Sequence, residues 1–247
     1  MISDMMIAGS LVTALCTLLG ALPAMLFTKV THRGRDILLA FTAGIMVAAS
    51  TYGLIPSALK LSNLVTLTIG ILLGTAVLTL MEWLVPHKDP GHAELKSGSA
   101  SAASPMLFLS AMALHNLPEG LSVGVGFGSM SPDLGTIVAL SIGLQNVPEG
   151  FLIALFLIAH RMNKWIALLL AGVTGFLELL FCWIGYAFTG SFAAVVPYGL
   201  AFAAGAMLFV VYKELIPESH GDGHERAATF SFILGLLVMI GITLLLK

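Results

Sequence analysis

The chain has 247 residues, of which 58% are hydrophobic and only 10% charged, with a mean hydropathy of +1.00 and a formal net charge of -2. Charged residues make up about a quarter of a typical soluble domain, so this composition excludes a soluble globular protein and predicts an integral membrane protein. The nearly balanced charge gives no reason to expect nucleic acid as a partner.

Apolar runs recur along the chain, each about twenty residues long, which is enough for a helix to cross a hydrocarbon core of about 30 Å. They are too continuous for the alternating strands of an outer-membrane barrel. We therefore expect an all-α integral membrane protein with one domain over residues 1–247. The eight expected transmembrane helices cover residues 5–28, 36–59, 64–86, 105–128, 133–159, 164–188, 193–217 and 227–246. The first run could be a signal peptide, but its short lead carries Asp4 rather than a basic residue, which favours a retained helix.

Basic residues gather at one end of the expected bundle. The connections after the first, third, fifth and seventh helices hold Lys29, Arg33, Arg35, Lys88, Lys96, Arg161, Lys164 and Arg226. The opposite end holds only Lys60 and Lys247. Cytoplasmic loops of membrane proteins are enriched in lysine and arginine. We therefore expect a cell-membrane protein with its odd-numbered connections in the cytoplasm and both termini outside.

An internal repeat predicts how these helices are arranged. Residues 40–59 (AFTAGIMVAASTYGLIPSAL) align without gaps on residues 201–220 (AFAAGAMLFVVYKELIPESH). The two segments fall in the second and seventh helices, which should cross the membrane in opposite directions. This predicts an inverted repeat of helices one to three and six to eight around a central pair, as in many secondary transporters. The alternative is chance similarity between helices rich in small residues.

The central pair carries nearly the same phrase twice, HNLPEG at residues 115–120 and QNVPEG at residues 145–150. Helical positions three and four apart share a face, so the polar side chains of each phrase should converge. They are His115, Asn116, Glu119, Gln145, Asn146 and Glu149. Ionised carboxylates are costly inside a membrane and imply a compensating partner, for which a divalent metal ion is the natural candidate. A lone asparagine or glutamine would instead indicate a hydrogen-bonding contact between helices.

The same two phrases contain prolines, which cannot donate a backbone hydrogen bond. Pro118 and Pro148 should therefore interrupt the hydrogen bonding one turn back and kink both helices. Freed carbonyl groups persist in a membrane only where they are satisfied again or line a polar cavity. We expect two kinked helices whose polar faces look at each other.

Other helices offer further candidate ligands. Glu178, in the sixth expected helix, is a third deeply placed carboxylate and should join the same site. Met46, in the second helix, could be a thioether ligand or a packing residue. Cys16 and Cys182 lack a metal-binding or disulfide spacing and are expected to be small buried hydrophobic residues.

The two phrases resemble the fourth- and fifth-helix motifs of the ZIP (Zrt/Irt-like) family of divalent metal transporters, in its bacterial form. The GxxE at residues 175–178 and ELIPE at residues 214–218 are similar to the family's sixth- and seventh-helix patterns. The resemblance covers essentially the whole chain. It implies eight helices in a 3+2+3 arrangement, movement of metal into the cytosol, a homodimer and an elevator-like motion.

The resemblance also implies a binuclear site between the fourth, fifth and sixth helices. The first metal position would use His115, Glu119, Gln145 and Glu149, with Met46 as a further candidate. The second would use Asn116, Glu119, Asn146, Glu149 and Glu178, with the two shared glutamates bridging. Nitrogen and oxygen ligands suit zinc, cadmium, iron and manganese, of which zinc is our first choice. The metal is expected as transported cargo, and no cofactor is expected.

Two departures from the family pattern bear on this site. Gln145 stands where many members have a second histidine, which should weaken the first metal position. Lys213 precedes Glu214 where relatives often have an acidic residue or histidine, which should make the cytoplasmic exit less attractive to cations.

Weaker metal sites are expected near the cytoplasm. The loop over residues 87–104 has the composition of a flexible linker and resembles a reduced form of the family's histidine-rich loop. The candidate loop and exit ligands are His87, His92, Glu214, Glu218, His220 and His224.

Two other classes of protein are alternatives. A membrane metallopeptidase should carry HExxH, which this sequence lacks, so we do not expect an enzyme. A metal sensor or structural metal-binding bundle would explain a bound ion without transport, but it gives no reason for an inverted repeat.

Overall fold

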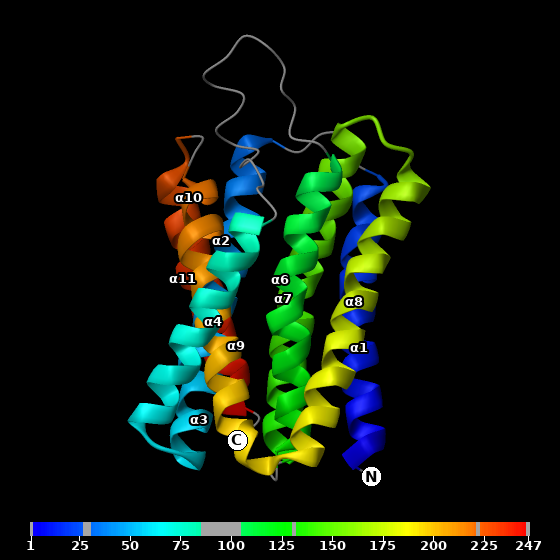
Figure 1. The fold of residues 1–247 in the computed structure, drawn as a ribbon. Helices are drawn as coiled ribbons and strands as arrows, with labels where there is room; N and C mark the ends of the chain where they lie inside the picture. The colour runs from blue at the N-terminus through cyan, green and yellow to red at the C-terminus, as the bar shows by residue number, and fades with distance from the viewer. Residues whose placement is uncertain (1, 27–30, 85–104, 130–131, 221–222, 246–247) are drawn as a thin grey trace.

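The structure is a computed structural model that describes residues 2–26, 31–84, 105–129, 132–220 and 223–245. These residues form eight long helical segments and no strand (Figure 1). Six segments are single α-helices, namely α1 (Ile2–Ala24), α4 (Leu64–Leu84), α6 (Pro105–Gly128), α7 (Pro132–Ala159), α8 (Lys164–Ser191) and α11 (Glu225–Leu245). The prediction of an all-α protein is therefore confirmed.

The remaining two segments are composite. One consists of α2 (His32–Ala48), the π-helix η1 (Ala49–Leu54) and α3 (Ile55–Leu61). The other consists of the 3-10 turn η2 (Ala193–Val195), α9 (Val196–Val210), the π-helix η3 (Val211–Leu215) and α10 (Ile216–Ser219). α2 begins four residues earlier than the sequence suggested, because the Thr31 side chain accepts a hydrogen bond from the Gly34 amide and caps the helix there.

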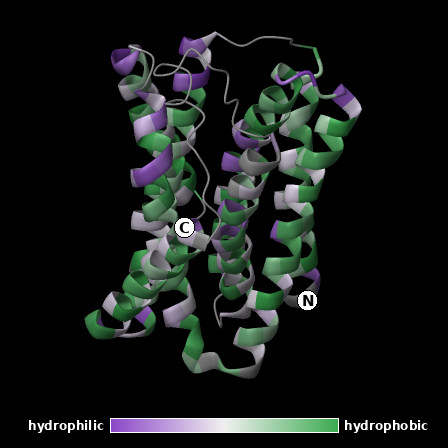
Figure 2. Cartoon of the chain, turned by 45° about the horizontal axis from the view of Figure 1, so that its top comes forward, coloured by the Kyte–Doolittle hydropathy of each residue, from purple (hydrophilic) through white to green (hydrophobic). Residues whose placement is uncertain are grey.

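The chain is a multi-pass membrane protein. In the described residues, seven helices are long and apolar enough to cross a membrane. The eighth, α6, is also long, at 24 residues, but His115, Asn116 and Glu119 reduce its hydropathy. Figure 2 shows hydrophilic residues at one end of the bundle and along its inner helices, with hydrophobic residues over most of the rest.

The eight segments pack as two groups of four (Figure 1). The first, which we call the central group, contains α1, α6, α7 and α8, with α1 against α7 and α6 against α8. The second, which we call the flanking group, contains α2–α3, α4, α9–α10 and α11, with α2 against α11 and α4 against α9. Thus α1, the first helix of the expected repeat, packs with the helices that carry the two polar phrases.

Glycines explain how closely α1 and α7 approach. A Cβ atom at Gly20 would collide with the Val147 carbonyl, and one at Gly150 would collide with the Thr17 carbonyl. The two backbones therefore touch at two places along the pair, as small residues permit at helix contacts in membranes. This contact fixes α1 to the polar helix α7.

The two repeated segments share an unusual backbone feature. In each, the helix widens to π geometry just before a proline, and the Ile55 and Ile216 amides bond to the carbonyls of Ser50 and Val211, five residues back. These are equivalent positions in the alignment of residues 40–59 with 201–220. The two segments also run in opposite directions (Figure 1). The inverted relation of the complete three-helix units stays a prediction.

The expected interruptions at Pro118 and Pro148 do not appear as breaks, because α6 and α7 are α-helical through both residues. Neighbouring helices can satisfy the backbone groups that a proline frees. Among the described helices, π geometry occurs instead in the repeated segments.

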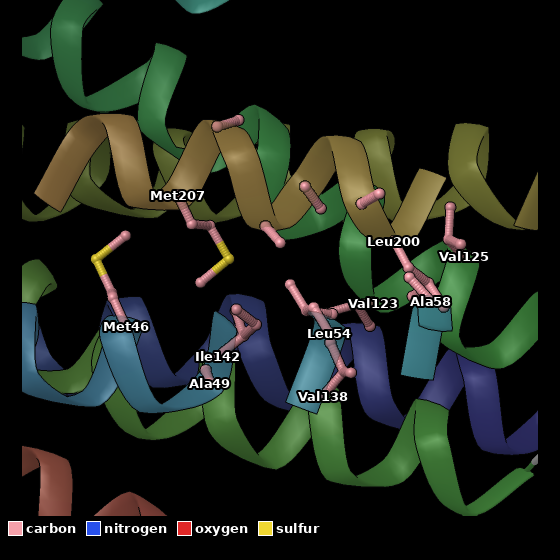
Figure 3. Packing of buried hydrophobic residues seen from close by; sticks show 14 of the residues in the cluster. Met46, Ala49, Leu54, Ala58, Val123, Val125, Val138, Ile142, Leu200 and Met207 are labelled. Carbon is pink, nitrogen blue, oxygen red and sulfur yellow. The ribbon is translucent and has the colours of Figure 1, made fainter. Parts of the chain in front are cut away.

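An apolar cluster lies between the two groups, and most members labelled in Figure 3 come from the half in which Figure 1 shows α3. Both groups contribute to it. The labelled members are Met46, Ala49, Leu54, Ala58, Val123, Val125, Val138, Ile142, Leu200 and Met207. Because these labelled side chains are buried and apolar, they offer water and ions no polar partner in this half of the interface.

Candidate metal centre

Seven expected ligands come from the three helices α6, α7 and α8. All are buried, with at most 6% of the residue surface exposed. They are His115, Asn116, Glu119, Gln145, Asn146, Glu149 and Glu178. Glu119 lies within electrostatic reach of Glu149 and Glu178, and Glu149 within reach of His115. The polar faces of the repeated phrases are therefore brought together inside the protein.

The first direct contact joins α7 to α6. The Gln145 side-chain amide donates a hydrogen bond to Oε1 of Glu119. Within the described structure, the other carboxylate oxygen, Oε2, and the Gln145 carbonyl oxygen have no hydrogen-bond partner.

The second contact joins α7 to α8 and α1. Nδ2 of Asn146 donates to Oε2 of Glu178 at 2.6 Å and to the backbone carbonyl of Thr13 at 3.1 Å. Nothing in the residue pattern indicated that α1 takes part in the site. The hydrogen bond from Asn146 uses a main-chain oxygen of α1, which is the same chemical group in every residue and therefore leaves no signal in the sequence.

The third contact crosses between the two groups. Nε2 of His115, on α6, lies 2.7 Å from Oε2 of Glu214, on η3. Glu214 was expected only along the exit path, but the structure brings it to the edge of the candidate metal centre. The neighbouring Lys213 points to a different partner and forms an ion pair with Glu82 of α4.

Oxygen acceptors without partners are the main chemical feature of the centre. Six buried side chains each leave one oxygen with no hydrogen-bond partner in the described structure. They are Asn116, Glu119, Gln145, Asn146, Glu149 and Glu178. Buried polar groups are normally hydrogen-bonded, so a gathering of unpaired acceptors calls for a positively charged ligand. Carboxylate and amide oxygens are ligands that divalent cations accept.

The centre is not a cluster built from charged residues and histidine alone. Within the residues described, no three His, Cys, Asp or Glu side chains are grouped so that they could hold a metal ion. The His115 nitrogen already contacts Glu214, and two of the carboxylates already accept amide hydrogen bonds. Any ion held here must therefore draw on amide oxygens as well.

Sequence comparisons identify the family. The family model described as ZIP zinc transporter matches residues 86–245. The chain belongs to the ZIP family. It is 35% identical to the protein named zinc transporter GufA from Myxococcus xanthus, over 95% of this chain and 96% of that protein. It is 32% identical to the protein named zinc transporter ZIPB from Bordetella bronchiseptica, over 91% of this chain and 75% of that protein.

Family membership confirms the resemblance that the repeated phrases indicated. Because the ZIP relatives are transporters, the chain is a transporter and not an enzyme. The match also covers α6, α7 and α8, which carry seven of the expected ligands.

Met46 occupies a different environment in this ZIP protein. It is 3% exposed and belongs to the apolar cluster, where its side chain points toward the same space as that of Met207 (Figure 3). This apolar environment accounts for Met46 as a packing residue, and its role as a ligand stays a prediction.

Two of the expected exit residues, Glu218 and His224, contact α2. Glu218 forms an ion pair with Arg35, and Nδ1 of His224 lies 3.1 Å from Oδ2 of the buried Asp36. Nδ1 of His220 lies 2.9 Å from the carbonyl oxygen of Ile216. Arg35 and Asp36 were missed as partners, because nothing local in the sequence pairs them with residues more than 180 positions away. His87 and His92 lie outside the described residues.

Proposed function

We propose that this ZIP protein moves divalent metal ions, with zinc as the first choice, across the cell membrane into the cytosol. The observation that carries the proposal is the set of six unpaired oxygen acceptors on α6, α7 and α8. A cation would supply the partner that each of them lacks. Zinc also appears in the names of the relatives from Myxococcus xanthus and Bordetella bronchiseptica.

The proposed site is binuclear. One ion would be held by His115, Glu119, Gln145 and Glu149, with Met46 as a further candidate. The other would be held by Asn116, Glu119, Asn146, Glu149 and Glu178, with Glu119 and Glu149 bridging. The shared carboxylates neutralise one divalent ion, and Glu178 contributes one of the two further negative charges that would balance a second ion. Cadmium, iron and manganese accept similar ligands and are candidate competitors.

The packing of the two groups supports a route for the ion. Apolar side chains such as Leu54 and Leu200 line the half of the interface nearest α3, whereas His115 and Glu214 add polar groups toward the other end. The distribution of basic residues favours a cytoplasmic location for that other end. Alternating access would follow if the central group moved relative to the flanking group. In a homodimer, each protomer would carry out this motion.

Uptake of radioactive zinc into proteoliposomes tests the proposal. We expect saturable uptake by the unchanged protein and its loss in Glu119→Ala and Glu149→Ala. Asp133→Ala is the matched control, because it removes an exposed carboxylate from the same helix as Glu149. Unlabelled cadmium, iron and manganese should compete for uptake in an order that ranks the transported ions.

A metal sensor or structural metal-binding bundle is the alternative. It would bind zinc through the same oxygen atoms but would move none of it. Zinc binding by the folded, unchanged protein without any uptake would therefore favour this alternative and count against transport.

A further inference from the structure

Two adjacent amides on α7 contact carboxylates on two different helices. Gln145 donates to Glu119 of α6, and Asn146 donates to Glu178 of α8. In both pairs, the amide N–H faces the carboxylate, and the amide carbonyl oxygen has no hydrogen-bond partner among the described residues. One helix thus provides donors to two of the three carboxylates in the centre.

The orientation of Asn146 is fixed more strongly than that of Gln145. An amide nitrogen carries two hydrogens, and those of Asn146 have two acceptors, Glu178 and the Thr13 carbonyl. If the amide turned over, its oxygen would face both of these acceptors, and the contacts would be repulsive. Gln145 has one such acceptor, Glu119.

A buried carboxylate is stabilised by an N–H donor even though the amide carries no net charge. The same amide can present its carbonyl oxygen to a cation, because the donor and acceptor atoms lie on opposite sides of the group. The two roles are therefore compatible within a single side chain.

We propose that Gln145 and Asn146 act as neutral counter-ligands, which means that they hold Glu119 and Glu178 by hydrogen bonds whenever a metal ion leaves them. This inference rests on the proposed transport function and concerns its return step. Net transport requires the carrier to move back without its ion, and a site with unsolvated, unpaired carboxylates would resist that movement. Exchange of one ion for another does not require the empty return step.

The test compares net uptake with exchange in Gln145→Glu and Asn146→Asp. Both substitutions keep the side-chain length and an oxygen that can bind metal, but they remove the N–H donors. Radioactive zinc uptake is measured into zinc-free proteoliposomes and into proteoliposomes preloaded with unlabelled zinc. We expect net uptake to fall about tenfold or more relative to exchange. The fall should be larger for Asn146→Asp, whose amide makes two hydrogen bonds.

Asn116→Asp is the matched control. It adds a carboxylate to the same centre, but no described hydrogen bond joins Asn116 to a carboxylate. We expect its added charge to lower the ratio of net uptake to exchange, but by less than in Gln145→Glu and Asn146→Asp, which also lose an N–H donor. An equal fall of the ratio in all three variants would show that added charge is responsible, and it would overturn the proposal.

The remaining outcomes separate this inference from the proposed function. If the unchanged protein shows neither exchange nor net uptake, transport itself is contradicted. Exchange with an unchanged ratio in both test variants would contradict only the role of the amides. If a variant has no transport, its thermal unfolding in detergent still decides: we expect zinc to raise its Tm by more than it raises that of Asn116→Asp, which gains a carboxylate but loses neither of these donors. An equal zinc effect would again overturn the proposal.

Discussion

The two repeated segments have the same backbone but different side chains where they border the route between the groups. Both α2–α3 and α9–α10 contain a π-helix before a proline, at equivalent positions. Glu214 on η3 contacts His115, whereas the equivalent residue on η1 is Gly53, which has no side chain to offer. Both segments therefore contribute to the apolar cluster, but only α9–α10 also extends the polar centre, through Glu214.

This contrast shows how a repeated fold can acquire a direction. The π-helices give both segments the same local widening, which is a feature often found at functional sites. The side chains then decide which end is apolar and which is polar. Substitutions at equivalent positions can test this separation directly.

The largest effect is expected from removing packing in the apolar half. Leu54 is 2% exposed within the apolar cluster, and truncation to alanine should cost about 2 to 4 kcal/mol of stability. Leu215 occupies the equivalent position in the other segment and is also buried in the cluster. We expect both alanine variants to lower the Tm. Only Leu54→Ala should also expose the half nearest the termini.

A membrane-impermeant thiol reagent measures that exposure. Ser50→Cys introduces a thiol on η1 at a position that is fully buried. Labelling from the side of the termini should be faster in the presence of Leu54→Ala and unchanged by Leu215→Ala. Equal labelling with both alanine variants would mean that the apolar half does not act as a separate closure.

An intermediate effect is expected at the polar position that distinguishes the segments. Glu214→Gln keeps the side-chain size but removes the charge next to His115. Hydrogen bonds to charged groups contribute about 1.5 to 3 kcal/mol, so we expect zinc uptake to fall about tenfold to a hundredfold. Glu82→Gln is the matched control, since it also breaks an ion pair, to Lys213, but at an exposed site. Similar losses in both variants would argue against a special role for Glu214.

The sequence was informative where structure depends on local patterns. Hydropathy predicted the helices, and the spacing of the repeated phrases indicated which polar faces would meet. The contact of Asn146 with the Thr13 carbonyl could not be predicted, because it uses a backbone atom of another helix. The position of Glu214 could not be predicted either. A π-helix adds a residue to one turn and thereby rotates the next part of the helix by about 100°. Such rotations depend on packing and proline placement together, not on periodicity alone.

The smallest of these effects concerns a pair of equivalent methionines. Met46 and Met207 are both buried in the apolar cluster and point into the same space between the segments (Figure 3). Substitution by leucine approximately conserves volume, so each change should cost less than about 1.5 kcal/mol of stability. If Met46 is also a thioether ligand, Met46→Leu should weaken competition by cadmium, a soft ion, more than competition by manganese. Met207→Leu should leave the ratio of these two competitors unchanged. The ratio therefore separates ligation from packing, and an equal response of the two variants would assign both methionines to the apolar closure.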